Sequence, residues 1–358
     1  MMRQLVRSIL LAALAAVPAP ASIVLSDPSV GSISLVTPPD QQVHLGLIDG
    51  LAFDQFGNLF GTLEVSDTSG GVVWIDKSTG NVTSMVTGIS RADQLSFALS
   101  GHLFVSSEVT PASTTNRIYD VQIGYIGSTP DPATTSLTSL TTSLSIDNPE
   151  GLVVLNTTNG FGDSGDMIVA EDGNPGRLLK VLADGTTSEI VTGLARPEGV
   201  ALGRFAGDTV DTVYVAETSN NRVLRIDSSA NVSVVGDPTS VSLTAPDNVR
   251  IGPDGYLYIT EDRPSPNSRV VRVAPDGTFS VLATGFGQAS GMAFDPSNGD
   301  MYIAEQDFSR VWRIEFSSVP EPSLIPIWCA GGLLIGICFM VKERKTESKT
   351  PAERYLSA

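Results

Sequence analysis

The chain has 358 residues, 41% hydrophobic and only 17% charged, a balance too apolar for a disordered protein. Residues 22–320 carry 15 Lys and Arg against 35 Asp and Glu, a net charge of −20. Such a surface repels phosphate backbones, so the composition argues against a nucleic-acid partner and favours cations. Both cysteines, Cys329 and Cys338, lie in a C-terminal apolar run. Disulfides and thiolate chemistry are therefore excluded from the rest of the chain.

Residues 1–21 have the pattern of a secretory signal peptide. Arg3 and Arg7 precede an apolar stretch that is too short to cross a bilayer. Ala19 and Ala21 then place small residues at the cleavage spacing. The alternative is a buried N-terminal helix. We expect an exported protein of the cell envelope, cell surface or medium.

A second apolar segment lies near the other end. Residues 324–341 contain no charge and have about the minimum length of a transmembrane helix. Three basic residues follow at once, so the polar tail 346–358 is expected on the cytoplasmic side of the inner membrane. The basic residues are Lys342, Arg344 and Lys345.

The triplet Pro320-Glu321-Pro322 stands just before this segment. With the apolar span and the basic cluster it makes residues 319–345 resemble the PEP-CTERM sorting signal of Gram-negative bacteria. The resemblance implies an exosortase-type membrane protease as a partner. A plain single-pass anchor is the alternative, because the tail is longer and more polar than such signals usually carry.

The middle of the chain, residues 22–318, contains six repeats that open near residues 49, 93, 149, 197, 246 and 290. Each repeat starts with an acidic or small residue and an apolar strand, as in Asp49 before GLAFD. A second strand follows, such as VYVA from Val213, and then a third that usually starts with arginine, such as RVLRI from Arg222. Four strands in about 40–50 residues are typical of a propeller blade. We predict an all-β, six-bladed β-propeller; the alternative is a linear β-solenoid.

Two segments depart from the regular repeat. The sixth repeat stops after its third strand, near Phe316, while an unassigned strand, GSISLVT, starts at Gly31. We predict that this strand completes blade six and removes an open edge. The tract from Ser128 to Ser145 is rich in Thr, Ser and Pro, which predicts a mobile surface loop around one polar strand.

The segment VYVAETSNNRV, from Val213 to Val223, resembles the NHL repeat. The Pro-Glu-Gly-Val opener of the fourth repeat also resembles the SMP-30/gluconolactonase and strictosidine-synthase-like propellers. The likeness covers roughly residues 31–316 as a pattern. It implies either a partner-binding propeller or a Ca²⁺-dependent lactonase or esterase. On the second reading, Asp247 matches a position where an aspartate is a metal ligand and possible base, whereas Glu198 stands where an asparagine is usual.

Five of the six repeats open with a carboxylate. Since the first strand of a blade lines the channel, these side chains are expected at one mouth of it. Hard oxygen ligands from several blades suit Ca²⁺ better than zinc. The alternative is that they are splayed, solvated or bonded to backbone amides. The candidate metal ligands are Asp49, Asp93, Glu150, Glu198, Asp247 and Asn248.

Four further glutamates end the second strands of repeats three to six. Each precedes the arginine that opens the third strand, which predicts a repeated salt bridge rather than a set of ligands. They are Glu171, Glu217, Glu261 and Glu305. Glu64 and Glu108 fall one position later and are expected on the opposite face of their strands.

The two histidines, His44 and His102, are too few to argue for a Ser–His–Asp site. His44 could approach the channel, and His102 is predicted in a solvated turn. An enzyme built from this chain would use a carboxylate base or a metal-bound water. No organic cofactor is indicated.

The leading hypothesis is a surface binding module for a glycan, peptide, small molecule or matrix component. The alternative is a Ca²⁺-dependent lactonase or esterase, with Asp247 as base beside Glu150 and Glu198. A structural matrix protein is a third possibility.

Overall fold

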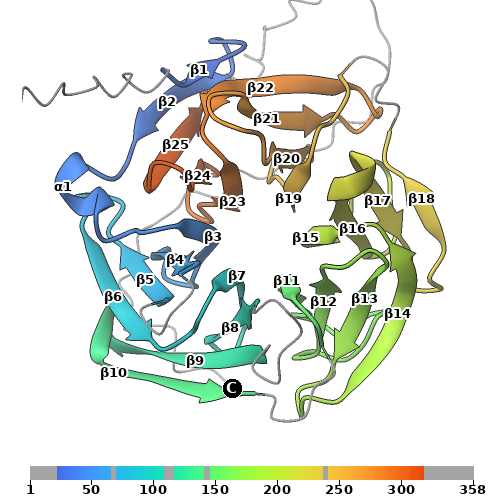
Figure 1. Cartoon of the computed structure of the whole chain (residues 1–358), viewed down its shortest axis with the longest axis horizontal. Helices are drawn as coiled ribbons and strands as arrows, with labels where there is room; N and C mark the ends of the chain where they lie inside the picture. The colour runs from blue at the N-terminus through green and yellow to red at the C-terminus, as the bar shows by residue number, and fades with distance from the viewer. Residues whose placement is uncertain (1–21, 66–69, 109–116, 141–145, 237–240, 318–358) are drawn as a thin grey trace, which may run out of the picture. The chain divides into compact units, whose positions relative to one another are not determined.

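The computed structural model describes residues 22–317 except 66–69, 109–116, 141–145 and 237–240. These residues form six antiparallel sheets around a central channel, which confirms the six-bladed β-propeller (Figure 1). The predicted signal peptide, sorting motif, transmembrane helix and polar tail lie outside them. No helix in the part described is long and apolar enough to cross a membrane.

Each blade starts at the channel and runs outward through four strands. Blades one and two comprise β3 (Ile48–Phe53), β4 (Leu59–Leu63), β5 (Gly71–Ile75) and β6 (Val82–Thr87), then β7 (Ala92–Phe97), β8 (His102–Ser107), β9 (Arg117–Ile126) and β10 (Thr129–Ser139). Blades three and four comprise β11 (Pro149–Val154), β12 (Met167–Glu171), β13 (Gly176–Val181) and β14 (Thr187–Leu194), then β15 (Pro197–Gly203), β16 (Thr212–Glu217), β17 (Arg222–Ile226) and β18 (Val232–Val234).

The last two blades use strands from both ends of the propeller sequence. Blade five comprises β19 (Pro246–Ile251), β20 (Leu257–Glu261), β21 (Ser268–Val273), β22 (Phe279–Phe286) and the outer β1 (Val24–Leu25). Blade six comprises β23 (Ala289–Phe294), β24 (Met301–Glu305), β25 (Arg310–Phe316) and β2 (Gly31–Leu35). Two short helices complete the described elements, α1 (Pro39–Gln42) and the 3₁₀ turn η1 (Thr218–Asn220).

The predicted closing strand is confirmed. β2 pairs antiparallel with β25, with Ile33 opposite Ile314 and Leu35 opposite Trp312. The pairing of β1 with β22 was not anticipated, and it adds a fifth strand to blade five. Both ends of the propeller sequence are thus held by ladder hydrogen bonds, and blade six has no missing strand.

The polar tract of the second repeat contains the predicted strand, which is longer than expected. Residues from Thr129 to Ser139 form β10, and β10 pairs with β9 through a register shift between Asp131 and Ser136. This part of the tract is therefore sheet rather than loop, while residues 141–145 lie outside the described structure.

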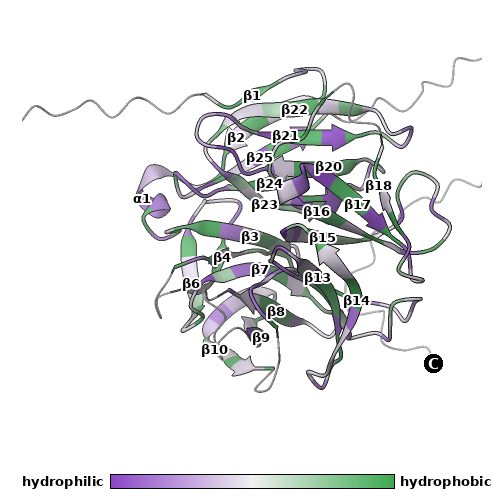
Figure 2. Cartoon of the chain, turned by 45° about the vertical axis from the view of Figure 1, so that its right-hand side comes forward, coloured by the Kyte–Doolittle hydropathy of each residue, from purple (hydrophilic) through white to green (hydrophobic). Residues whose placement is uncertain are grey.

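The hydrophobic core lies between neighbouring blades. Apolar side chains alternate along each strand, and those facing an adjacent blade form six clusters among the described residues. One cluster joins Ile48 and Leu51 of blade one to Tyr302 and Val311 of blade six. The interior strand β3 is largely hydrophobic in Figure 2. Because each blade packs on two others, the ring holds the first strands in fixed positions around the channel.

Deleting Gly31–Leu35 should lower the melting temperature of the chain by about 5 °C or more, since β25 loses its ladder partner and Ile33 leaves the core. Scanning calorimetry measures the change. Threonine in place of Ser32 and Ser34, whose side chains are exposed, is the matched control and should leave the melt unchanged. A deletion that melts like the parent would disprove the closure.

Candidate functional site

The residues that open the six repeats meet at one cavity of about 250 Å³ at a mouth of the channel. In every first strand the register shifts at this position, as between Ile48 and Leu51 of β3. A β-bulge bends the strand and redirects a side chain. The six openers that line the cavity are Asp49, Asp93, Glu150, Glu198, Asp247 and Ser290. The predicted convergence of the carboxylates is therefore observed.

Glycine follows the opener in four blades, and its missing side chain is required there. A Cβ at any of the four would collide with the backbone of the neighbouring first strand. The glycines are Gly50, Gly151, Gly199 and Gly291. The first strands thus approach one another closely, which leaves the opener side chains only the mouth of the channel to occupy.

Gln94 and Asn248 replace glycine in the other two blades, and Gln94 lines the cavity. Asn248 Nδ2 donates to Gln94 Oε1 over 2.8 Å, and Gln94 Nε2 donates to Asp49 Oδ1 over 2.9 Å. Asn248, a predicted ligand, is fully buried beneath the cavity, and no partner is found for its Oδ1 among the described residues. Asn248 does not line the cavity, so the structure does not bring this predicted ligand together with the carboxylates.

A second set of cavity residues was not recognised in the sequence as part of the site. These residues follow the end of the second strand by one position, and four of the six equivalents line the cavity: Glu64, Glu108, Asp262 and Gln306. Gln306 Nε2 donates to Asp49 Oδ2 over 3.0 Å and to Glu64 Oε2 over 2.8 Å. The sequence contained one signal for this set: Glu64 and Glu108 were expected on the opposite face of their strands, and that face turns towards the channel.

The four glutamates one position earlier form the predicted salt bridges and do not line the cavity. Glu171 Oε2, for example, lies 2.6 Å from Arg177 Nη2 and accepts the backbone N–H of Asp147 over 3.0 Å. Glu217, Glu261 and Glu305 each accept a backbone N–H at the same place in the following repeats. These glutamates fix the turn that leads into each first strand.

Those turns also bring cationic and amide side chains to the rim. The residue two before the opener has a left-handed backbone in five blades, which costs roughly 1–2 kcal/mol for a residue other than glycine. The φ values are 48° at Arg91, 46° at Asn148, 51° at Arg196, 46° at Ala245 and 41° at Gln288. Arg91, Arg196 and Gln288 line the cavity.

Each rim arginine contacts two carboxylates. Arg91 Nη2 lies 2.8 Å from both Glu64 Oε1 and Glu108 Oε2. Arg196 Nη2 lies 3.0 Å from Glu198 Oε1 and 3.1 Å from an oxygen of Asp172. The remaining openers have no ion-pair partner within 4.0 Å in the described part of the chain.

Eight carboxyl groups therefore share one cavity with two arginines. Burial raises the pKa of Asp49, Asp93, Glu150 and Asp247 well above the usual range, and their neighbouring carboxylates raise it further. The pKa of Glu198 rises to about 7, mainly through burial. Without a bound cation, burial and mutual repulsion thus disfavour the ionised form of these groups.

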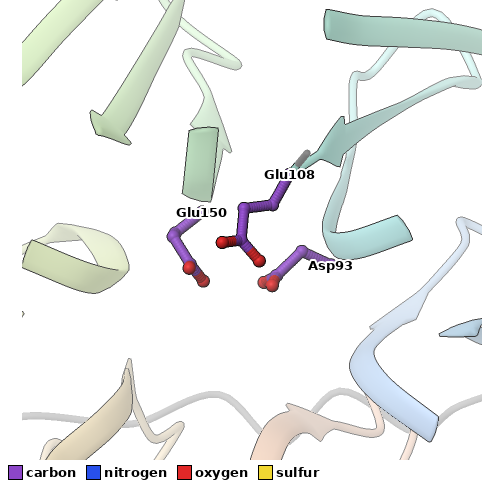
Figure 3. Close-up of side chains that lie close together, drawn as sticks. All are labelled: Asp93, Glu108 and Glu150. Carbon is purple, nitrogen blue, oxygen red and sulfur yellow. The ribbon is translucent and has the colours of Figure 1, made fainter. Parts of the chain in front are cut away.

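The donor set suits a hard cation. Asp93, Glu108 and Glu150 each offer an oxygen, and these three atoms lie within 4.8 Å of one another (Figure 3). The cavity is also lined by Ser290, which is 3% exposed and whose Oγ has no partner among the described residues. Carboxylate and hydroxyl oxygens without nitrogen or sulfur are the ligands that Ca²⁺ prefers. The residues present thus fit an oxygen-coordinated divalent ion.

Neither histidine lies in the cavity. His44 is exposed beyond α1, so it does not approach the channel. His102 lies in β8, where its Nδ1 is 2.9 Å from Asp120 Oδ2, instead of in a solvated turn. The side chains available for chemistry at the channel mouth are therefore carboxyl groups, arginines, amides and the hydroxyl of Ser290.

Solved structures match this chain over most of its length. A gluconolactonase from Xanthomonas campestris has a TM-score of 0.60 at 14% identity, over 84% of this chain and 95% of that one. A nutrient-binding protein from Bacteroides thetaiotaomicron has a TM-score of 0.56 at 13% identity, over 76% and 69%. Virginiamycin B lyase from Staphylococcus aureus, a histidine-to-alanine variant described as catalytically inactive, has a TM-score of 0.52 at 15% identity, over 79% and 99%.

No protein-family model and no curated sequence matches the chain. At these identities the structural likeness shows the fold, a six-bladed propeller shared by enzymes and a binding protein.

The raised pKa values predict how stability depends on pH. Between about pH 4 and the raised values, the folded state binds more protons than the unfolded chain. The free energy of unfolding of cation-free protein should therefore fall as pH rises from 5 to 8. Thermal melts in chelator measure this fall.

The double variant Glu150→Gln, Asp247→Asn should flatten the pH dependence of the free energy of unfolding, because it removes two of the acids whose pKa is raised. Glu217→Gln is the control: Arg222 and a backbone N–H oppose burial and lower the pKa of Glu217, so its loss should leave the slope in place. A cation-free melt that is constant or rises between pH 5 and 8 would show that the cavity carboxyls are ionised throughout.

Proposed function

We propose that this chain is a divalent-cation-dependent hydrolase that opens a lactone or an ester at the channel mouth, with Ca²⁺ as the preferred ion. The observation that carries the proposal is the convergence of eight carboxyl groups on one small cavity with only two arginines. Such crowding is unfavourable by itself, and a bound cation would offset it. The gluconolactonase likeness supports the reaction class at the level of the fold alone.

Two groups of carboxylates could hold the ion. Asp93, Glu108 and Glu150 have the closest oxygens, while Asp49, Glu198 and Asp247 occupy the openers of three other blades. Each group contains one carboxylate that already contacts an arginine, Glu108 with Arg91 and Glu198 with Arg196. When bound, the cation would polarise the carbonyl group of the substrate and make its carbon more electrophilic.

Asp247 is suited to act as the base. It has no ion-pair partner within 4.0 Å among the described residues, and burial and the neighbouring carboxylates raise its pKa, which makes its carboxylate a stronger proton acceptor. As water attacks the carbonyl carbon, Asp247 takes the proton, a new C–O bond forms and the ester C–O bond breaks. The proton then passes to the departing oxygen. Arg91 and Gln306, at the rim, can orient oxygen atoms of the substrate.

A binding module remains the second candidate, because the cavity contains no histidine and no cysteine. The nutrient-binding neighbour shows that the same fold occurs in a binding protein. In this case the cation would bridge the carboxylates to hydroxyl groups of a glycan or to a peptide carbonyl. The two candidates differ in one outcome, the hydrolysis of a bound ester.

We expect Ca²⁺ to raise the melting temperature of chelator-treated full-length chain, because a cation that binds only the folded state stabilises it by mass action. Mg²⁺ should raise it less, since it requires tight octahedral geometry. The calcium-loaded chain should hydrolyse glucono-δ-lactone or a phenyl ester faster than the chelated chain. Differential scanning fluorimetry and a pH-stat assay measure the two effects.

Two sets of variants separate binding from catalysis. Asp247→Asn should lower hydrolysis by about a hundredfold or more, as expected when a general base is lost, while much of the melting shift remains. The combination Asp93→Asn, Glu150→Gln should remove the melting shift as well. Glu315→Gln, at an exposed position of β25 outside the cavity, should change neither calcium binding nor the rate. A calcium shift without hydrolysis of any ester would support the binding module, and the absence of both would refute the cation site.

We also propose, from the terminal sequences, that the propeller is exported and sorted by its C-terminal segment through an exosortase-type protease. The basis is the order of Pro320-Glu321-Pro322, apolar span and basic cluster. Its ligand or substrate would then be met at the cell envelope or outside the cell, with the inner membrane as at least a transient anchor.

In a host with a working exosortase, alanines at Pro320, Glu321 and Pro322 should leave full-length protein in the membrane fraction, while the parent is shortened. Immunoblotting of fractions with an N-terminal-domain antibody measures this. Alanines at Thr346 and Ser348, in the polar tail, are the control. A parent that also persists at full length in the membrane would favour a plain anchor.

A further inference from the structure

A second pocket, of about 470 Å³, lies at the other end of the first strands. Each blade contributes one partly exposed apolar side chain, which belongs to the last or the next-to-last residue of its first strand. This apolar ring consists of Phe53, Phe97, Val153, Leu202, Ile251 and Phe294. A concave, mostly apolar pocket of this size is typical of a small-molecule site.

One cation lies in this apolar surface. Three residues after the opener, five blades carry a small or apolar side chain, whereas blade five carries Arg250, which lines the pocket. Arg250 Nη1 donates to the carbonyl oxygens of Val249 and Val200, over 2.8 and 3.0 Å. Burial lowers the pKa of Arg250 only to about 10, so the guanidinium is charged at neutral pH.

The guanidinium has no carboxylate within 4.0 Å among the described residues. Its Nε has no acceptor there, and its Nη2 makes only a 3.5 Å contact with Gln94 Oε1. Arg250 is half-buried, and pairing offsets the cost of removing a cation from water; a planar guanidinium fits a carboxylate with two parallel hydrogen bonds. Asp54, the carboxylate among the lining residues, is already engaged by Asn58 and by the Tyr125 hydroxyl.

The apolar pocket is separate from the acidic cavity. Gln94 and Asn248 bond to each other across the channel between the two, and Arg250 lies on the pocket side of this layer. A ligand in the pocket would therefore contact the guanidinium but none of the eight carboxyl groups at the other mouth, of which Asp247 acts on Arg250 through its charge alone.

We propose that the pocket formed by the apolar ring and Arg250 binds a small amphipathic carboxylate, with its hydrocarbon part against the ring and its carboxylate on the guanidinium. The charge complementarity identifies the head group, and the pocket volume suits a medium-length aliphatic acid. The proposal is independent of the reaction assigned to the acidic cavity.

Photolabelling of the full-length chain tests this site. A diazirine-bearing decanoic acid should label peptides that contain Phe53, Phe97 to Leu99 and Val153, as read by mass spectrometry. Octanoate should displace the label at a concentration about tenfold lower than octan-1-ol or octylammonium requires, because only the carboxylate can pair with Arg250. Equal competition by the three compounds, or label spread over other surfaces, would overturn the proposal.

Variants locate the interaction. Arg250→Gln should reduce octanoate competition about tenfold, and Arg250→Lys should retain part of it, since the charge remains but the planar pair is lost. Because Arg250 also bonds two backbone carbonyls, a rim variant is needed that does not endanger folding. Leu99, which lines the pocket and is 72% exposed, provides it.

Leu99→Asp should weaken octanoate binding several-fold by like-charge repulsion at the pocket rim. Val43→Asp, at a residue 77% exposed beyond α1, is the matched control and should bind octanoate like the parent. Folding of each variant is checked by its melting temperature. A folded Arg250→Gln or Leu99→Asp variant with parental octanoate binding would refute the site.

Discussion

The spacing of the six first strands is the constraint on which the rest of the molecule depends. They approach so closely that four of them need glycine after the opener, since a Cβ there would collide with the next strand. These four blades therefore place no side chain in the middle of the channel at this position, where Gln94 and Asn248 of the other two blades bond to each other. Packing between neighbouring blades, and the closure of blade six by β2, hold the strands at this spacing.

The two ends of the channel have opposite chemistry. Bulges at the openers place carboxylates around a polar cavity, whereas the far ends of the same strands present an apolar ring around one cation, Arg250. Gln94 stands between them: its amide nitrogen donates to Asp49 on one side and its oxygen accepts from Asn248. The hydrogen-bonded pair of Gln94 and Asn248 thus separates an acidic site from an apolar one.

The sequence predicted what repeats in every blade. Because every blade must bury the same positions, the repeat in the sequence predicts four features. These are the strand order, the closing strand from Gly31, the convergence of the openers and the glutamate–arginine salt bridges. Features that occur once were missed. The two-residue strand β1 is too short to carry a pattern, and the contacts of Gln94 with Asn248 and Arg250 join residues more than 150 positions apart. The sequence places Glu64 and Glu108 on the opposite face of their strands. It does not show that this face turns towards the channel, because that depends on the bulged first strands.

The central claim is that the carboxylates at the channel mouth form a cation site. Crystals grown with Tb³⁺ in place of Ca²⁺ test it directly, because the ion's anomalous scattering locates it without assumptions about activity. The account predicts a strong peak inside the cavity, about 2.4 Å from oxygens of at least three of its carboxylates. The absence of an anomalous peak in the cavity, or a peak only on the outer surface of the protein, would contradict the account.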